Sequence, residues 1–417
     1  MTSFLITNVR IFDGEKVIAE SGSVLVENGK IAKVSSSSSV SFDGPTYSKP
    51  GHTLLPGLID AHIHANNGNT VALPQSLRFG VTTVCDLHNE YFNIQKLRQQ
   101  IEGGDCADLK TTSYAATIEN GWPMFVVLAL HDSPEVREEL SHWPKLTTPE
   151  TGRQYIQDRV KENVDYIKLM HESGKFLGKT INKPSLELQQ AIITEAHAHG
   201  LKTIAHSTSL QDTLEILSCG VDGLAHTFID QAPTAELIEA YKKNDAHCNP
   251  TLACMGSATT EGQAQQERFA HDPRVRELLG EEERERMCAC MSFAKASGGR
   301  VEHAYETVRR LKEAGVPVII GSDSAAPAVG TAWGLSAHHE LSLFVHECSF
   351  TPLEALRAAT SLTASRFDFH DRGRIQEGLR ADLMLVQGDP TQEIDHTLDL
   401  RGVWTKGELC SAYRGKV

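Results

Sequence analysis

The chain has 417 residues, of which 40% are hydrophobic and 23% are charged, and this composition predicts a globular protein with one large domain and a smaller one. The formal net charge of −14 argues against general binding to nucleic acids or anionic membranes, and no stretch approaches the roughly 20 apolar residues of a membrane span. The nine cysteines include no CxxC pair, and the N-terminus lacks a signal-peptide pattern. We therefore expect free thiols and a cytoplasmic location.

Both ends of the chain carry β-strand patterns. The N-terminal part contains the runs FLITNVRIF, GSVLVENGKIAKVS and HTLLP, with turn signals at DG and NG dipeptides. Strand patterns return near the C-terminus in GRIQEGLRADLMLVQGD and LDLRGVWTKGEL. We predict that residues 1–55 and 365–417 together form one small β-sandwich, which is a discontinuous domain built from both termini.

Residues 56–364 alternate short apolar runs with amphipathic helical stretches such as SLELQQAIITEAHAHG and AYETVRRLKEAG, each of which ends at a glycine. The eight runs are GLIDAHIHA, VTTVCDL, KTTSYAATI, VDYIKLM, KTIAHS, GLAHTF, HCNPTL and PVIIGSDS. Alternation of strands and helices predicts a parallel sheet, and eight such units predict a closed (β/α)8 TIM barrel of the α/β class. A doubly wound open sheet is the alternative.

Potential metal ligands stand at the ends of several of these runs. His62 and His64 are two residues apart, so in a strand both side chains point to the same face. A lone histidine there is usually structural, and a lone aspartate after a strand is usually a helix cap. In a barrel, however, the C-terminal strand ends meet at one mouth. Six such residues at that mouth predict a metal site, formed by His62, His64, Lys168, His206, His226 and Asp323.

The residue types fit zinc chemistry. Imidazole and carboxylate groups are good Zn²⁺ ligands, whereas a lysine ammonium is not a ligand. Burial beside cations lowers the pKa of a lysine, and the neutral amine that results can take up CO₂ to become a carbamate. A carbamate on Lys168 would present two anionic oxygens and could bridge two metals, as in other two-metal hydrolases.

The motifs PGLIDAHIH, GVTTV, IKLM, AHTF and GSDS, taken together, resemble those of the amidohydrolase superfamily in its binuclear form with a carboxylated lysine. The resemblance covers almost the whole chain and points to the subgroup of imidazolonepropionase-like hydrolases, Xaa-Pro dipeptidases and ochratoxinase-like amidases. It implies two Zn²⁺ per chain, bridged by carboxylated Lys168. His62, His64 and Asp323 would bind the more buried metal, and His206 and His226 would bind the second.

This resemblance implies hydrolysis of a C–N amide bond in a small molecule, such as an N-acyl compound, a dipeptide-like molecule or a cyclic amide. A metal-bridging hydroxide would attack the carbonyl with Asp323 as general base. A lactonase or esterase on the same metals is an alternative. A mononuclear deaminase is disfavoured by Lys168 and by Ser209, which stands where that branch has a glutamate. A non-catalytic scaffold is a remote alternative, since such relatives lose ligands.

Three further residues are candidates for substrate binding, namely His88, Trp122 and His171. The segment TTVCDLH departs from the subgroup pattern, and TIENGWPMFVVLALHDSPEV replaces its loop rich in glycine and histidine. Residues 253–300 are long for a connection in a barrel and fit either a lid or an oligomer contact. We expect a homo-oligomer, and the sequence leaves the substrate undetermined because pocket loops set it.

Overall fold

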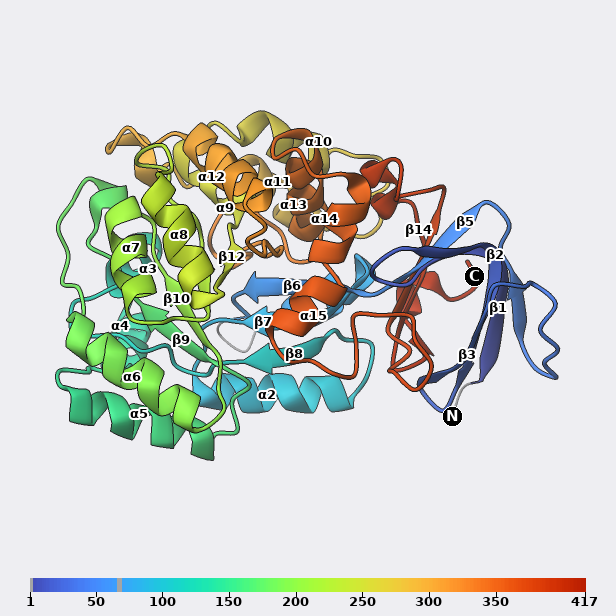
Figure 1. The fold of residues 1–417 in the computed structure, drawn as a ribbon, viewed down its shortest axis with the longest axis horizontal. Coiled ribbons are helices and arrows are strands. Elements are labelled where there is room, and N and C mark those ends of the chain that lie inside the picture. The colour runs from blue at the N-terminus through green and yellow to red at the C-terminus, as the bar shows by residue number, and fades with distance from the viewer. Residues whose placement is uncertain (1–2, 66–69) are drawn as a thin grey trace.

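The computed structural model describes residues 3–65 and 70–417 and shows a mixed α/β fold (Figure 1). A large sheet lies at one end of the molecule together with both termini, and parallel strands surrounded by helices form the rest. No helix among the described residues is long and apolar enough to cross a membrane.

Strands from both chain ends form one eight-stranded sheet in the order β15-β14-β13-β5-β1-β2-β3, with β4 paired to β1. The two ends join where β5 pairs antiparallel with β13. Asn28 and Gly29 have φ angles of 53° and 76°, as the NG turn between β2 and β3 requires. All eight strands of this region belong to one hydrogen-bonded sheet that both termini build. Their bounds are β1 Phe4–Phe12, β2 Val17–Glu27, β3 Lys30–Ser35, β4 Thr46–Ser48, β5 His52–Pro56, β13 Leu383–Gln387, β14 Leu400–Thr405 and β15 Glu408–Leu409.

Seven of the eight apolar runs of the central region are parallel strands. They form two sheets, β6-β7-β8 and β12-β11-β10-β9, and nearly all their residues are buried. Burial on both faces explains why these runs are continuously apolar and do not alternate. Their bounds are β6 Leu58–Ile63, β7 Val81–Asp86, β8 Asp108–Thr111, β9 Ile167–Met170, β10 Thr203–His206, β11 Gly223–Ala225 and β12 His247–Asn249.

The eighth run, residues 317–324, is not a regular strand. It makes two isolated parallel bridges, Val318 with Cys248 in β12 and Ser324 with Ile63 in β6. Between them, the backbone N–H of Ser322 donates to the side chain of Asp60 at 2.9 Å, where a regular strand would use a neighbouring carbonyl. A side-chain acceptor has therefore replaced part of the backbone ladder at this position.

Helices connect the strands, and several begin at the hydroxyl caps that the sequence contains. The side chains of Ser185, Ser209 and Thr234 each accept a backbone N–H from the first turn of the helix that follows. Ser209, which stands where a deaminase would have glutamate, is thus the cap of α7. The α-helices are α1 Ala72–Arg78, α2 Tyr91–Glu102, α3 Met124–Leu130, α4 Pro134–Ser141, α5 Pro149–Lys161, α6 Leu186–Ala198, α7 Leu210–Ser218, α8 Ala235–Asn244, α9 Leu252–Thr259, α10 Gln263–Ala270, α11 Glu281–Cys288, α12 Val301–Glu313, α13 Leu335–His346, α14 Pro352–Ala358 and α15 Ser361–Arg366.

The C-terminal segment is tied to β8 by a partly buried ionic cluster. The Asp108 carboxylate pairs with Arg372 at 2.6 Å and with Arg380 at 2.5 Å. Burial raises the pKa of Asp108, but the guanidinium groups of Arg380 and Arg372 more than offset this and hold the pKa below its usual range. Because this pKa is depressed in the folded state, the cluster contributes stability above the unfolded-state pKa.

We predict that Asp108→Asn lowers the free energy of unfolding by about 2 kcal/mol at pH 7, because charge-assisted hydrogen bonds to two arginines are lost. Denaturant unfolding of the parent and the variant, measured from pH 7 to pH 3, tests this. The difference should shrink as the pH falls below about 4, where the unfolded aspartate becomes protonated. A difference that does not depend on pH would contradict an ionic contribution.

Candidate metal centre

The six predicted ligands come together at one end of the parallel strands. His62 lies near the end of β6 and His64 one residue beyond it, while His206 ends β10 and His226 follows β11. These strands run parallel, so their C-terminal ends face the same side. The remaining two ligands are Lys168 in β9 and Asp323 in the 317–324 segment.

Three ligand atoms form a compact triangle around one point. Asp323 Oδ1 lies 3.2 Å from His62 Nε2 and 3.2 Å from His64 Nε2, and the two nitrogens are 3.3 Å apart. Ligands placed about 2.1 Å from a zinc ion, at tetrahedral to octahedral angles, are separated by about 3.0–3.4 Å. The donor atoms of these three residues therefore already have the spacing that a divalent cation requires.

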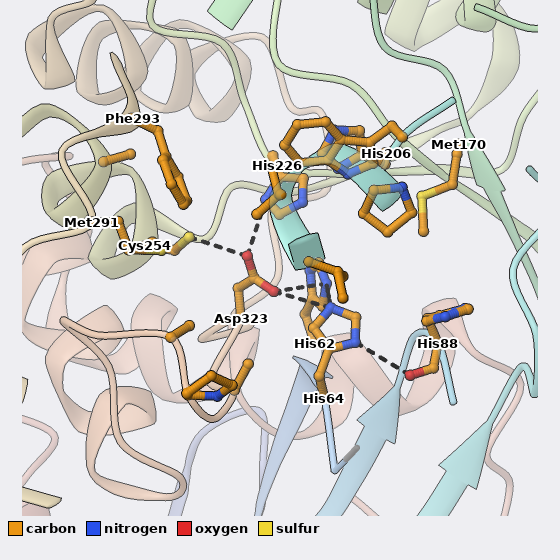
Figure 2. Close-up of a pocket in the computed structure, with 18 of the residues that line it drawn as sticks. His62, His64, His88, Met170, His206, His226, Cys254, Met291, Phe293 and Asp323 are labelled. Carbon is orange, nitrogen blue, oxygen red and sulfur yellow. Dashed lines mark hydrogen bonds and ion pairs between the residues drawn. The ribbon is translucent and has the colours of Figure 1, made fainter. Parts of the chain in front are cut away.

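The other histidines line the same space. The ring of His226 lies with its centroid 4.9 Å from that of His62 and 4.6 Å from that of His206. His226 Nδ1 contacts the hydroxyl of Thr251 at 2.8 Å. Figure 2 shows the Asp323 carboxylate between the imidazoles of His62 and His64 on one side and the Cys254 thiol on the other, and that thiol donates to Asp323 Oδ2 at 3.1 Å.

Lys168 is the most unusual member of the group. Its side chain is 1% exposed, and its Nζ has no hydrogen-bond partner among the described residues. Burial lowers its pKa to about 7, although the charge of Asp323 raises it. A buried amine without a partner is costly, so the site gains if the amine becomes a ligand-bearing group.

The protonation of most of the other ligands also suits a metal. His64 is the exception. Burial lowers its pKa, but the hydrogen bond to Asp323 and the charges of Asp323 and Asp86 outweigh burial and raise it. Burial lowers the pKa of His62, His206 and His226 well below the usual value, which favours the neutral imidazole that binds metals. Burial raises the pKa of Asp323, but the neighbouring imidazoles outweigh this effect and hold it well below its usual range. The donor set thus consists of the three neutral imidazoles of His62, His206 and His226, the imidazole of His64, one carboxylate and one buried amine.

A cavity of about 510 Å³ adjoins these residues. Its walls come mainly from two long connections, the one after β8 and the one after β12. The second of these contains residues 253–300, several of which line the cavity. Apolar side chains dominate the lining, including Trp122, Val126, Val127, Val136, Trp143, Met170, Phe176, Met255, Ala258, Met291 and Phe293.

Two of the three predicted substrate residues line this cavity. The Trp122 ring stacks on His206 with centroids 4.6 Å apart, and the His88 ring meets Trp143 edge-on at 4.3 Å. His88 Nδ1 accepts the backbone N–H of Ala115 at 3.0 Å, and burial lowers the pKa of His88 to about 4.

The structure does not bring His171, the third predicted substrate residue, to the cavity. Its Nε2 donates to Glu215 at 3.0 Å, and its Nδ1 accepts from Gln189 at 3.4 Å. Glu215 is also paired with Lys183 at 2.5 Å. The position after β9 suggested the barrel mouth, but these partners draw the ring into the packing between the strand and its helices. Substrate contact by His171 therefore has no support from this geometry.

Several buried groups behind the ligands were missed from the sequence. Asp60 accepts the backbone N–H of His62 at 3.2 Å and the hydroxyl of Ser322 at 2.6 Å, and so links β6 to the 317–324 segment. Asp86 Oδ1 lies 4.0 Å from His64 Nδ1. The sequence signal for both was a carboxylate inside an apolar strand run, which carries a cost unless it is bonded.

The model of the amidohydrolase family matches residues 53–410. The chain belongs to the amidohydrolase family. It is therefore classed with hydrolases that act on carbon–nitrogen bonds, and families of this type generally depend on metals. The described part of the chain contains groups of side chains that could hold a metal ion, among them His62, His64 and Asp323.

Individual relatives are more distant. An imidazolonepropionase of Thermoplasma volcanium is 21% identical over 92% of this chain and 88% of its own length. One of Deinococcus deserti is 34% identical, but the match spans only 24% of this chain and 25% of the relative. Among solved structures, phenylurea hydrolase B has a TM-score of 0.76 at 19% identity, covering 99% and 97% of the two chains. A Xaa-Pro dipeptidase with bound methionine has a TM-score of 0.74 at 20% identity, covering 98% and 99%. These likenesses show a common fold.

We predict that His62→Ala and His64→Ala each remove most of the bound metal, whereas His171→Ala leaves it in place. The first two variants lose a donor atom of the triangle around Asp323, and the third removes a ring that lies outside the cavity. Metal analysis after loading with zinc and gel filtration measures this. Far-ultraviolet circular dichroism controls for unfolding, and loss of metal from His171→Ala would refute this ligand assignment.

Proposed function

We propose that this protein is a binuclear, zinc-dependent amidohydrolase that cleaves the C–N bond of a small amide with a large apolar group. The observation that carries the proposal is the buried, unpartnered amine of Lys168 among four histidines and an aspartate. A lysine in that position has no structural role that its contacts reveal. A lysine that becomes a carbamate has a clear one, because it supplies anionic oxygens between two cations.

In this proposal, His62, His64 and Asp323 would hold one zinc ion, His206 and His226 would hold the second, and carboxylated Lys168 would supply the anionic group shared by both. The neutral Lys168 amine adds to carbon dioxide, which forms an N–C bond and releases one proton. The lowered pKa of Lys168 favours this step, because only the unprotonated amine reacts. The triangle of donor atoms around Asp323 supports the first metal position.

When bound, the two cations supply a water molecule acidic enough to attack at neutral pH and polarise the substrate carbonyl. Asp323 then acts as the general base, since its ionised carboxylate can hold a proton and pass it to the leaving nitrogen. Trp122 and Phe293 stand in the cavity wall and exclude water from the substrate.

We further infer that the parallel strands close into a (β/α)8 barrel. Three isolated parallel bridges support this closure. Ala116 pairs with Leu169 and so links the segment after β8 to β9, while the bridges of Val318 and Ser324 link the eighth run to β12 and β6. With these links the two sheets and the eighth run would form a continuous ring, with the ligands at one mouth.

We predict that Lys168→Ala is almost inactive and binds zinc less tightly, because the two cations lose the anion between them. Acetate or propionate carries the same two-oxygen group and can enter the space left by the side chain. Activity should therefore return in part with zinc and millimolar to molar short carboxylate. Rates measured on a panel of apolar N-acyl amides would detect this.

Chloride at equal ionic strength controls for screening and should not restore activity. A fully active Lys168→Ala would refute the binuclear proposal and leave a mononuclear site on His62, His64, His206 and Asp323.

The cavity also suggests how a substrate is oriented. Among the described residues that line it, Arg286 of α11 is the only arginine. Its ion pair with Glu283 is long, with 3.8 Å between Nη2 and Oε1, so the guanidinium donors are not committed to that partner. We propose that Arg286 binds an acidic group at the outer end of the substrate, as in an N-acyl amino acid with an apolar side chain.

We predict that Arg286→Gln lowers kcat/KM for N-acetyl-phenylalanine by about 10- to 100-fold, the value of a charge-assisted hydrogen bond, with little change for its carboxamide. Arg284→Gln is the matched control, because Arg284 lies on the same helix and bonds to the backbone of Arg276 and Leu279. Equal losses on both substrates would argue against a carboxylate contact.

A further inference from the structure

The first turn of α9 contacts the candidate metal centre twice. We call residues 251–254 the α9 turn. Its first residue, Thr251, places Oγ1 2.8 Å from His226 Nδ1, and its last residue, Cys254, donates from Sγ to Asp323 Oδ2 at 3.1 Å. Figure 2 shows this thiol directed at the Asp323 carboxylate. Two predicted ligands thus depend on one short segment for their orientation.

The α9 turn has a backbone that needs support. Thr251 has φ 49° and ψ 51°, a left-handed conformation that is unfavourable for a β-branched residue. His226 and Asp323 also have positive φ angles, of 76° and 52°. Such conformations persist only where surrounding contacts determine them, and they cluster at functional sites. Thr251 precedes α9 in the position of its cap, but its hydroxyl contacts His226 and caps no N–H of the helix.

Glu340 of α13 provides the missing acceptor. Its Oε1 accepts the backbone N–H of Ala253 at 2.5 Å, and the other carboxyl oxygen has no hydrogen-bond partner among the described residues. The side chain is completely buried. Burial raises its pKa to about 8, although the N–H groups of Ala253 and Leu252 lower it.

The buried carboxyl group of Glu340 lowers the stability of the fold. Besides its burial, the charges of Asp60 and Asp323 disfavour ionised Glu340. Leucine would fill a similar volume in α13 without a desolvation cost, and buried ionic groups contribute little net stability compared with apolar residues. The carboxyl group of Glu340 is therefore explained by its hydrogen bond to the α9 turn.

We propose that Glu340 is a positioning residue for hydrolysis, because it holds the α9 turn in the conformation that orients His226 and Asp323. Thr251 Oγ1 accepts the Nδ1–H of His226, which leaves the Nε2 lone pair free to bind a metal. Cys254 donates to one oxygen of Asp323 and leaves the other with His62 and His64. The catalytic part of this proposal rests on the proposed amidohydrolase function, whereas the geometric part does not.

The first experiment compares three substitutions on α13. Glu340→Leu removes the acceptor and should lower kcat by at least about 10-fold with KM nearly unchanged, since misplaced groups lose rate more than binding. Glu340→Gln keeps an acceptor oxygen and should stay within about threefold of the parent. Ser342→Ala is the control, because Ser342 is buried on the same helix and its hydroxyl has no partner among the described residues. If Glu340→Leu does not fold, Glu340→Asp replaces it, since the shorter side chain cannot reach Ala253 without movement.

A double-mutant cycle separates positioning from general stabilisation. If Glu340 acts through the α9 turn, the loss of kcat caused by Glu340→Leu should be several-fold smaller in a Cys254→Ala background than in the parent. A purely structural role predicts equal losses in both backgrounds. Equal losses, or a Glu340→Leu variant with the parental kcat, would overturn the proposal.

A second measurement needs neither metal nor turnover. In metal-free protein, iodoacetamide should alkylate Cys254 several-fold faster in Glu340→Leu than in the parent, because the α9 turn is released, while Cys288 and Cys290 serve as internal references. Mass spectrometry of the peptides measures each rate. An unchanged Cys254 rate overturns the geometric part. If no variant or parent hydrolyses any amide but this rate rises, the proposed function fails and the positioning of the α9 turn stands.

Discussion

The interior position of Lys168 is the constraint on which the rest of this site depends. An ammonium group buried without a partner would destabilise a fold by several kcal/mol. The strand that carries Lys168 pairs with β10, which ends at His206, and the next strand of the same sheet, β11, is followed by His226. Among the described residues no carboxylate bonds to its Nζ, and burial lowers the pKa of Lys168 to about 7, which favours the neutral amine. The chemistry proposed for the site follows from that state, because a neutral amine can become an anionic bridge and an ammonium cannot.

Around Lys168, buried polar contacts hold the ligands in backbone conformations that are unfavourable without such support. Asp60 bonds to Ser322 and to the backbone of His62, and so joins the first strand to the irregular eighth run. Glu340 plays the same part for α9, because its carboxyl group accepts a backbone N–H from the first turn of that helix. Each of these carboxyl groups is completely buried and bonded to backbone N–H groups. The ligand positions are thus determined by hydrogen bonds from behind as well as by the strands.

The cavity is built differently from the ligand cluster. Its ligand side comes from strand ends, whereas its outer walls come from the connections after β8 and β12, which vary most readily in a fold of this kind. Apolar side chains cover most of those walls, and the guanidinium of Arg286 interrupts them. A substrate with an apolar body and an acidic end matches both features. The same metal chemistry on another set of loops would serve a different amide, which is why the fold alone does not name the substrate.

The sequence by itself determined most of the strand pattern, the six candidate ligands and the family, because these depend on local order. Strands of period two place His62 and His64 on one face, and parallel strands bring their ends together however the loops are arranged. The sequence also pointed to His88 and Trp122, which line the cavity. Only the tertiary structure decided that His171 turns away toward Glu215, that the backbone N–H of Ser322 in the eighth run bonds to Asp60, and that Glu340 bonds to a turn 87 residues earlier in the chain. The physical reason is common to all three. Each depends on a hydrogen bond between residues far apart in the chain, and no local pattern of residues specifies which buried donor such an acceptor will meet.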